Sequence, residues 1–238
     1  MNVETLTSNL PAFFQCLAEC HFEVLTKPEK RTEPINETQL KGLFDRLTEL
    51  ALSDVFETVG SCNPWNLAGL GRDEVRNAAV LKWLLSPRGD HGLQAELLRN
   101  LLADIPDFPQ EPSRYCRLAV EDCPDGLRDS RVDIRIDDPR NFFLIIEVKI
   151  GASEQSDQLR RYCEIAAACA RDGRPWKVVY LTCRGSAPTT AGEFIDDVVP
   201  ISWSRISEHL RMIVRMRKGG HEISNFLANS FAKHISSF

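Results

Sequence analysis

Apolar residues recur at helical spacing through the first sixty residues, and no alternating pattern interrupts them. One helix is expected over 7–25, followed by a charged stretch at 27–34 that contains two prolines and is typical of a loop. A second predicted helix carries an apolar stripe formed by Leu40, Leu43, Phe44, Leu47, Leu50 and Ala51. This stripe is expected to pack on the rest of the chain or on a partner, and it makes a homodimer a reasonable hypothesis.

The helical pattern breaks near Pro64, so we expect a helical N-terminal region at 1–62 and a second domain at 63–238. The second domain opens with a helix that Asp73 is suited to cap. Its expected apolar positions are Val75, Ala78, Ala79, Leu81, Leu84 and Leu85. Another helix is predicted over 93–103, before two prolines.

The pattern changes from helical to alternating beyond this pair of helices. Strands are expected at 117–121, 131–137 and 142–150, with a turn at 138–141. The sequence RVDIRID alternates cleanly, with Val132, Ile134 and Ile136 on one face and Asp133, Arg135 and Asp137 on the other. The run FFLIIEVKI is apolar almost throughout, which predicts a central strand covered on both faces.

The remaining pattern predicts a helix at 153–171, strands at 176–183 and 198–202, and two final helices at 204–217 and 222–236. The turn between the earlier strands indicates an antiparallel meander, and the strand–helix–strand step indicates a parallel crossover. We therefore predict an α/β fold with a mixed central sheet, flanking helices and a helical N-terminal extension.

Composition narrows the class of protein. The 238 residues are 43% hydrophobic, which is enough for one substantial core. Neither a membrane-length apolar run nor a secretory signal is visible, so we expect a cytoplasmic protein with no membrane partner. The eight cysteines form no CxxC pair and are expected to be reduced. The net charge of −5 argues against indiscriminate coating of nucleic acid.

Asp133, Glu147 and Lys149 carry the most informative chemistry. Glu147 and Lys149 project from the same strand face beside isoleucines, where burying charges is costly unless they pair or bind something. If the strands pair through the turn, Asp133 reaches the same end of the sheet. Two carboxylates suit Mg²⁺ or Mn²⁺, and a lysine can position water or stabilise charge on phosphorus. The alternative is a structural ion pair of Glu147 with Lys149 or Arg131.

Three further residues surround this set in the sequence. Gln158 and Tyr162 lie four residues apart on the helix that follows Lys149, so they share a face. Glu74 occupies the first turn of the helix that precedes the strands. Each has an ordinary explanation: a polar helix edge for the first two and compensation of the helix dipole for Glu74.

Taken together, Glu74, Asp133, Glu147–Val148–Lys149 and QLRRY resemble the PD-(D/E)XK nuclease superfamily. The stretch EVRNAAVLKWLLSPRGDHG, followed by RVDIRI, IIEVKIGASEQSDQLRRY and PISW, is similar to a bacterial branch that is uncharacterised or associated with defence. The resemblance covers about two-thirds of the chain and leaves out the first 60 residues. It implies a restriction-endonuclease-like αβββαβ core.

The resemblance also implies roles for individual residues. Asp133 and Glu147, with the main-chain carbonyl of Val148, would hold Mg²⁺ or Mn²⁺. Lys149 would be catalytic, and Glu74 would be an auxiliary acid near the metal. The implied activity is phosphodiester hydrolysis on DNA.

Gln158 and Tyr162 would support the site or the substrate. The sequence departs from the superfamily pattern in two places, because Val132 replaces the motif proline and Asn77 stands where the branch often has histidine. His91 matches the branch, and it would either touch substrate or close the preceding helix; we favour the second interpretation.

Basic residues gather in two regions, and such clusters can hold phosphates or simply face solvent. They are Arg205, Arg211, Arg215, Arg217, Lys218 and His221 near the C-terminus, and Arg160, Arg161, Arg171 and Arg174 after Lys149. The competing hypothesis is a catalytically inactive interaction or regulatory module that keeps the nuclease fold. The acidic net charge favours that alternative, whereas the intact acid–lysine set favours the enzyme.

Overall fold

The computed structural model describes residues 62–123, 131–170, 173–217 and 221–238. The chain divides into two units, Met1–Gly60 and Ser61–Phe238. The two helices and the apolar stripe predicted for the N-terminal region therefore lie outside the described residues, and the account below concerns the second unit.

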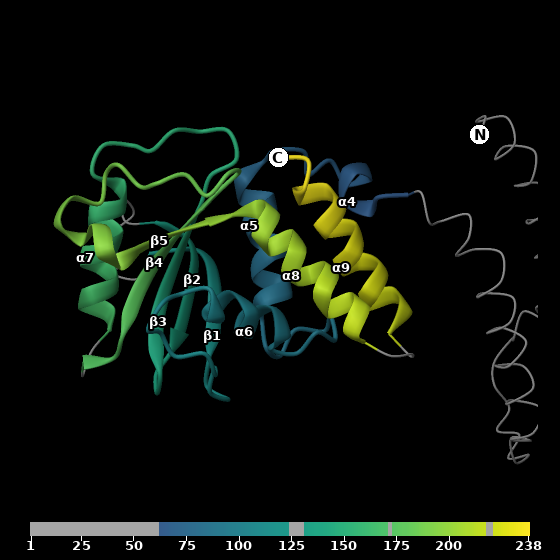
Figure 1. Cartoon of the computed structure of the whole chain (residues 1–238), viewed down its shortest axis with the longest axis horizontal. Coiled ribbons are helices and arrows are strands. Elements are labelled where there is room, and N and C mark those ends of the chain that lie inside the picture. The colour runs from purple at the N-terminus through teal and green to yellow at the C-terminus, as the bar shows by residue number, and fades with distance from the viewer. Residues whose placement is uncertain (1–61, 124–130, 171–172, 218–220) are drawn as a thin grey trace, which may run out of the picture. The chain divides into compact units, whose positions relative to one another are not determined.

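Five strands form one mixed sheet in the order β1-β2-β3-β4-β5 (Figure 1). Strands β1, β2 and β3 are antiparallel neighbours, and β3, β4 and β5 are parallel neighbours. Their bounds are β1 (Arg117–Asp122), β2 (Val132–Asp138), β3 (Phe142–Val148), β4 (Trp176–Thr182) and β5 (Val198–Ser202). The predicted meander followed by a parallel crossover is confirmed, and so is the α/β fold class.

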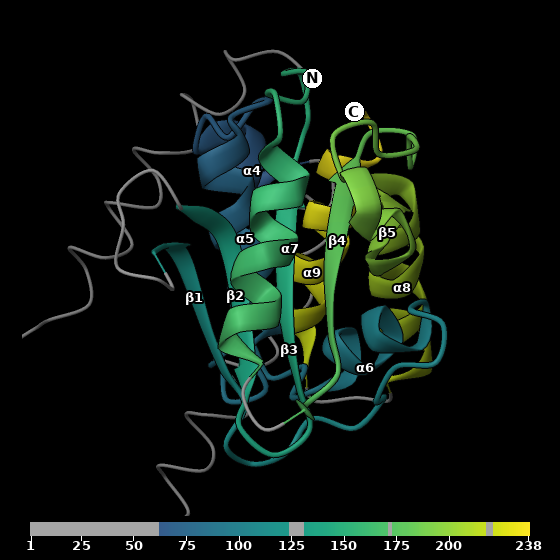
Figure 2. The ribbon, with the colours of Figure 1, turned by 90° about the vertical axis from the view of Figure 1, so that its left-hand side faces the viewer.

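Helices cover both faces of this sheet. In Figure 2, α7 lies in front of the sheet, and α5, α6, α8 and α9 lie behind it. The bounds are α4 (Pro64–Leu67), α5 (Glu74–Leu85), α6 (Glu96–Ala103), α7 (Gln158–Cys169), the 3₁₀ helix η3 (Gly192–Asp197), α8 (Trp203–Met216) and α9 (Glu222–Ile235). Within the described residues, no helix is both long enough and apolar enough to cross a bilayer. The six cysteines of this part are free thiols.

The side chains of β2 enter two hydrophobic clusters, and Val132 belongs to the smaller one although the alternation predicted it beside Ile134 and Ile136. Ile134 and Ile136 enter the larger cluster, which α5, α6, α8 and α9 share with the sheet. The smaller cluster joins α7 to the opposite face and includes Phe143, Ile145 and Leu159. All seven residues of β3 are buried, as predicted for a central strand covered on both faces.

Helix α5 follows the predicted pattern with one correction. Asp73 caps it by accepting a hydrogen bond from the Arg76 amide at 3.0 Å. Val75 and Ala79 were expected in the apolar stripe but are exposed, and Asn77 takes a buried position instead. The reason is a polar network that no apolar residue could form.

In this network, the Asn77 side-chain amide donates to the carbonyl oxygens of Gly71 and Asp73. Its oxygen lies 3.1 Å from Nε2 of His234, which comes from α9. Asn66 Oδ1 lies 2.7 Å from the other ring nitrogen of the same histidine. The start of α5 is thereby tied to α4 and α9 through buried polar contacts around the His234 ring, whose N–H can donate to either amide oxygen.

Helix α7 begins at Gln158, later than the predicted start at residue 153. The intervening segment is held in another way, because the Glu154 carboxylate accepts the Thr190 amide at 2.8 Å. Asp157 then adopts a left-handed conformation with φ of 55°. This segment is therefore a loop anchored at Thr190 and is not part of the helix.

Candidate active site

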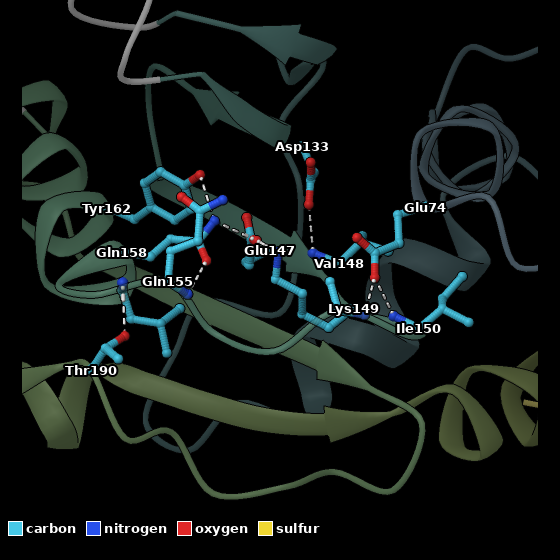
Figure 3. Close-up of polar contacts among 12 residues, drawn as sticks. Glu74, Asp133, Glu147, Val148, Lys149, Ile150, Gln155, Gln158, Tyr162 and Thr190 are labelled. Atoms are coloured by element: carbon cyan, nitrogen blue, oxygen red, sulfur yellow. Dashed lines mark hydrogen bonds and ion pairs between the residues drawn. The ribbon is translucent and has the colours of Figure 1, made fainter.

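The pairing of β2 with β3 brings Asp133 to the end of Glu147's strand (Figure 3). Asp133 Oδ2 accepts the main-chain amide of Val148 at 2.7 Å, so the carboxylate points toward β3. Burial raises the pKa of Asp133, and the hydrogen bond from Val148 opposes this change only in part. The expectation that both carboxylates meet at one end of the sheet is met by this geometry.

Glu147 is the most buried acid of the group, with 1% of its surface exposed. Its Oε1 accepts hydrogen bonds from Lys149 Nζ and from Gln158 Nε2, each at 2.8 Å. Its Oε2 is buried and has no hydrogen-bond partner within the described part of the chain. Burial and the neighbouring charge of Asp133 raise the pKa of Glu147 to about 8. Oε2 therefore has no donor among the described residues, and the acid beside Asp133 keeps a proton to a higher pH than an exposed glutamate does.

Lys149 follows β3 directly, and its main-chain amide donates to the Leu181 carbonyl at 2.8 Å. Its side chain is 12% exposed, so the ammonium lies inside the site but remains accessible to solvent. Burial alone would lower the pKa of Lys149, but the ion pair with Glu147 raises it above its ordinary value. The lysine is therefore charged at neutral pH and fixed in place.

Gln158 at the start of α7 and Tyr162 one turn later support Glu147. Gln158 Nε2 also lies 3.2 Å from the Tyr162 hydroxyl, which in turn donates to the Arg131 carbonyl at 2.9 Å. Both side chains are buried. The shared helix face predicted from their spacing is what allows them to form one chain of hydrogen bonds.

Glu74 binds main-chain groups rather than a side chain of the site. Its Oε1 accepts the amides of Ile150 at 2.7 Å, Gly151 at 3.2 Å and Ala152 at 3.3 Å. Burial favours the neutral acid, but these amides and Lys149 together hold the pKa of Glu74 below its usual value. The side chain thus fixes the turn that follows the lysine, and it stays ionised.

Two residues of this site were not identified from the sequence. Arg72 Nη2 donates to the Ile150 carbonyl at 2.6 Å, so Arg72 and Glu74 hold opposite sides of the same short segment. Glu154 binds the amides of Thr189 and Thr190 and ties the loop before α7 to the loop before η3. Neither pairing has a local sequence signal, because each partner lies far along the chain.

Several arginines of the two predicted basic clusters are committed to structure. Arg205 forms a bidentate contact with Asp104, Arg217 donates to the Gly92 carbonyl, and Arg174 pairs with Asp137. Lys218 and Arg171 lie outside the described residues. These clusters therefore supply fewer open cations than their sequence suggests.

His91 closes the turn after α5 and is buried, as we favoured from the sequence. Its Nε2 lies 2.9 Å from the Ser86 carbonyl, and its Nδ1 accepts the Leu93 amide at 2.9 Å. Burial lowers the pKa of His91. Both bonds are satisfied by the neutral ring, which holds the turn in one conformation.

The donor set fits a hard divalent cation. Asp133 and Glu147 place two carboxyl groups in a buried position where ionising both is unfavourable, and a cation would favour their ionised forms and satisfy the unpaired Oε2 of Glu147. In the described residues, no group of three or more His, Cys, Asp or Glu side chains is arranged to hold a metal. A bound cation would therefore need main-chain oxygen or water to complete its shell, and the Val148 carbonyl stays the predicted main-chain ligand.

Comparison with known protein families matches residues 62–233 to the PD-(D/E)XK nuclease superfamily. Searches of curated proteins and of solved structures gave no match. The matched segment contains the whole sheet, α5, α7 and every residue of the site described above. The chain therefore belongs to the PD-(D/E)XK nuclease superfamily.

Proposed function

We propose that this chain is a divalent-metal-dependent nuclease that hydrolyses phosphodiester bonds in DNA. The observation that carries the proposal is the buried Glu147 carboxylate, which has one oxygen without a partner beside Asp133 and an ammonium at 2.8 Å on the other oxygen. A purely structural ion pair would gain from satisfying both oxygens. The choice of DNA rests on the restriction-endonuclease-like resemblance of the sequence.

Asp133, Glu147 and the Val148 carbonyl would hold the cation. When bound, Mg²⁺ or Mn²⁺ supplies a Lewis acid that polarises a phosphate oxygen and acidifies an attacking water. The chain's own part is positioning: Val148 fixes Asp133, and Gln158 fixes Glu147. With both carboxylates already oriented, little reorganisation is required when the site is filled.

Lys149 is the catalytic residue of the proposal. Its ammonium is held by Glu147 and remains partly exposed, so it can donate to a phosphate oxygen or to the attacking water. A charged donor in a partly desolvated site stabilises developing negative charge more strongly than it would in water. Glu74 is a positioning residue, because it fixes the amides that follow Lys149 and touches no reacting atom.

The test is cleavage of supercoiled plasmid, linear duplex and single-stranded DNA, with Mg²⁺, Mn²⁺ or EDTA. We expect metal-dependent cleavage that Lys149→Ala reduces by at least about 100-fold, because a charged donor to the transition state is lost. The matched control is Lys177→Ala. This substitution removes a partly exposed lysine of β4 that pairs with Asp197, and it should leave the cleavage rate unchanged.

Asp133→Ala should abolish both the cleavage and any stabilisation of the fold by Mn²⁺. Cleavage that survives this substitution would refute the site. If no substrate is cut and Mn²⁺ does not raise the melting temperature, the inactive interaction module is the better hypothesis.

A further inference from the structure

Two buried polar side chains beside the start of α5 have no part in the chemistry proposed above. His234 of α9 is 4% exposed and Asn77 of α5 is 0% exposed, and Nε2 of the histidine lies 3.1 Å from Oδ1 of the asparagine. The two residues are 157 positions apart in the chain. A buried polar contact adds little net stability over apolar packing, but it fixes one geometry, and the groups that Asn77 binds show which geometry this is.

Asn77 holds the main chain on both sides of Arg72. Its side-chain amide donates to the Gly71 carbonyl at 3.2 Å and to the Asp73 carbonyl at 2.8 Å. Because the amide nitrogen is used on the main chain, the side-chain oxygen is left to face His234. The histidine therefore fixes the orientation of the Asn77 amide, and the amide fixes the backbone that carries Arg72.

A second contact joins His234 to the side chain of Arg72. The Arg72 guanidinium lies 5.7 Å from the centroid of the Phe238 ring, within the range of a cation–π contact. The same ring lies 5.2 Å from the His234 ring, with an angle of 82° between the two planes. The main chain of Arg72 is thus held through Asn77, and its side chain is held by a ring that packs on the histidine.

Arg72 and Glu74 bind the residue that directly follows Lys149. The Ile150 carbonyl accepts Arg72 Nη2 at 2.6 Å, and the Ile150 amide donates to Glu74 Oε1 at 2.7 Å (Figure 3). Both polar main-chain groups of Ile150 are therefore held by the turn at 71–74, which Asn77 fixes in its turn. Since Lys149 is joined to Ile150 by one peptide bond, this turn determines where the backbone of the lysine lies.

We propose that His234 is a positioning residue for Lys149, acting through Asn77 and the turn at 71–74. The inference rests on the proposed function for the role of the lysine, and it adds a residue of α9 to the support of the site. A displacement of about 1 Å at a catalytic group can cost about 100-fold in rate, so a distant support of this kind has a measurable effect. Metal binding should not respond, because Val148 and Gln158 hold the two carboxylates separately.

The test compares two amide substitutions at position 234. A glutamine amide reaches the place of the histidine Nε2, whereas an asparagine amide reaches only as far as Nδ1. His234→Gln therefore keeps the contact with Asn77 and His234→Asn loses it, while both keep an uncharged polar side chain in the same place. Hydrogen exchange of the Ile150 amide, followed by NMR in EDTA, requires no cleavage. We expect exchange about tenfold faster in His234→Asn and changed by less than about twofold in His234→Gln.

Cleavage kinetics provide the second measurement. His234→Asn should lower kcat by about tenfold and leave both KM and the Mn²⁺ concentration for half of the full activity unchanged, because only the lysine is displaced. His234→Gln should restore most of the lost kcat. A merely stabilising role would accelerate exchange at Ile145 in β3 as much as at Ile150. That result, or equal behaviour of the two variants, would overturn the proposal.

Arg72→Gln tests the last link from an exposed position, where folding should not be affected. The matched control is Arg76→Gln, because Arg76 is also exposed and donates to a main-chain carbonyl, but to that of Gly69 at 3.1 Å. Only Arg72→Gln should accelerate exchange of the Ile150 amide, again by about tenfold. Equal exchange rates in these two variants would contradict the inference even if His234→Asn did not fold.

The two measurements separate this inference from the proposed function. Faster exchange at Ile150 in His234→Asn, in a chain that cuts no DNA, would defeat the proposed function and leave the coupling between His234 and the lysine segment standing. Metal-dependent cleavage with the same kcat and the same Ile150 exchange in His234→Asn would do the reverse: the proposed function would stand, and His234 would have no positioning role.

Discussion

The two faces of the sheet differ in the kind of polar group that they bury. The face covered by α5, α6, α8 and α9 buries a continuous apolar cluster, where Asn77 and His234 have polar partners and the buried atom without one, among the described residues, is the neutral indole nitrogen of Trp203. The face covered by α7 has a smaller cluster, and it ends in Glu147 with an unsatisfied oxygen. Burying such a group is costly, so the second face gives up stability at the point where chemistry is expected.

This difference indicates that one face of the sheet mainly stabilises the fold and that the other carries the candidate site. A buried carboxylate without a full set of partners is kept only if something else compensates for it, and a bound cation does so. The larger cluster supplies the stability that permits this local deficit. Substitutions on the two faces should therefore have separable consequences, in folding on one side and in metal dependence on the other.

The largest effect is expected from Phe231→Ala on the first face. Phe231 is fully buried in α9 and contacts the rings of Trp65 and Trp203. Its truncation should lower the free energy of unfolding by about 3–5 kcal/mol, through lost burial and the cavity that remains. Urea denaturation of the two proteins measures this difference.

The same variant also tests the separation of the faces. The Mn²⁺ concentration that gives half of the full stabilisation should be unchanged, because Phe231 belongs to the larger cluster and the carboxylates lie on the opposite face. A folded Phe231→Ala protein that no longer responds to Mn²⁺ would mean that the two faces are energetically coupled.

Most of the fold could be predicted because the strands carry their pattern locally. The alternation around Ile134 and Ile136 and the continuous apolar run before Glu147 require no knowledge of distant residues. The start of α7 could not be predicted, since it depends on Glu154 binding Thr190 from another loop. The buried position of Asn77 likewise depends on His234, which is far away in the sequence and adjacent only in space.

The residues of the site also divide into those that the local sequence identifies and those that only the tertiary structure reveals. Asp133, Glu147 and Lys149 could be singled out because charges inside apolar strands are locally anomalous. The main-chain partners of Glu74 and the contact of Arg72 with Ile150 arise only when the helix meets the end of β3. The sequence therefore indicates which residues are chemically unusual, but the tertiary structure decides whether each one touches a reacting atom or a supporting amide.

The second prediction concerns pH and the metal-free protein. The folded state raises the pKa of Glu147 to about 8, from an ordinary value of 4.5, so the folded chain holds a proton that the unfolded chain has lost. The contribution of this group to the free energy of unfolding is fully present below pH 4.5, and it is lost as the pH rises from there through about 8. In EDTA, the free energy of unfolding should fall by about 2 kcal/mol between roughly pH 6.5 and 8.5.

Glu147→Gln is the matched control, because it keeps the shape of the side chain and removes the titration. Its stability should be nearly flat over the same range of pH, and Mn²⁺ should not stabilise it. In the unsubstituted protein, stabilisation by Mn²⁺ should grow with pH, since the cation competes with the proton for the carboxylate. Parallel pH profiles for the two proteins would show that Glu147 does not carry the expected proton.

The smallest effect is expected from Tyr162→Phe. This variant tests how much the Tyr162 hydroxyl on the α7 face contributes to stability and to Mn²⁺ affinity. The substitution removes the hydroxyl that donates to the Arg131 carbonyl and lies beside Gln158, and it should cost about 1 kcal/mol of stability. Gln158 keeps its bond to Glu147, so the affinity for Mn²⁺ should fall by less than about tenfold.

Tyr180→Phe provides the comparison for this last variant. Tyr180 is buried on the same face, and the acid that acts on its hydroxyl most strongly is Glu154, which belongs to the loop before α7. A similar loss of stability with no change in Mn²⁺ affinity is expected there, because Glu154 anchors a loop and does not support Glu147. Equal weakening of Mn²⁺ binding in both variants would indicate a general loosening of α7. The hydrogen bonds through Gln158 would then have no separate role in orienting the Glu147 carboxylate.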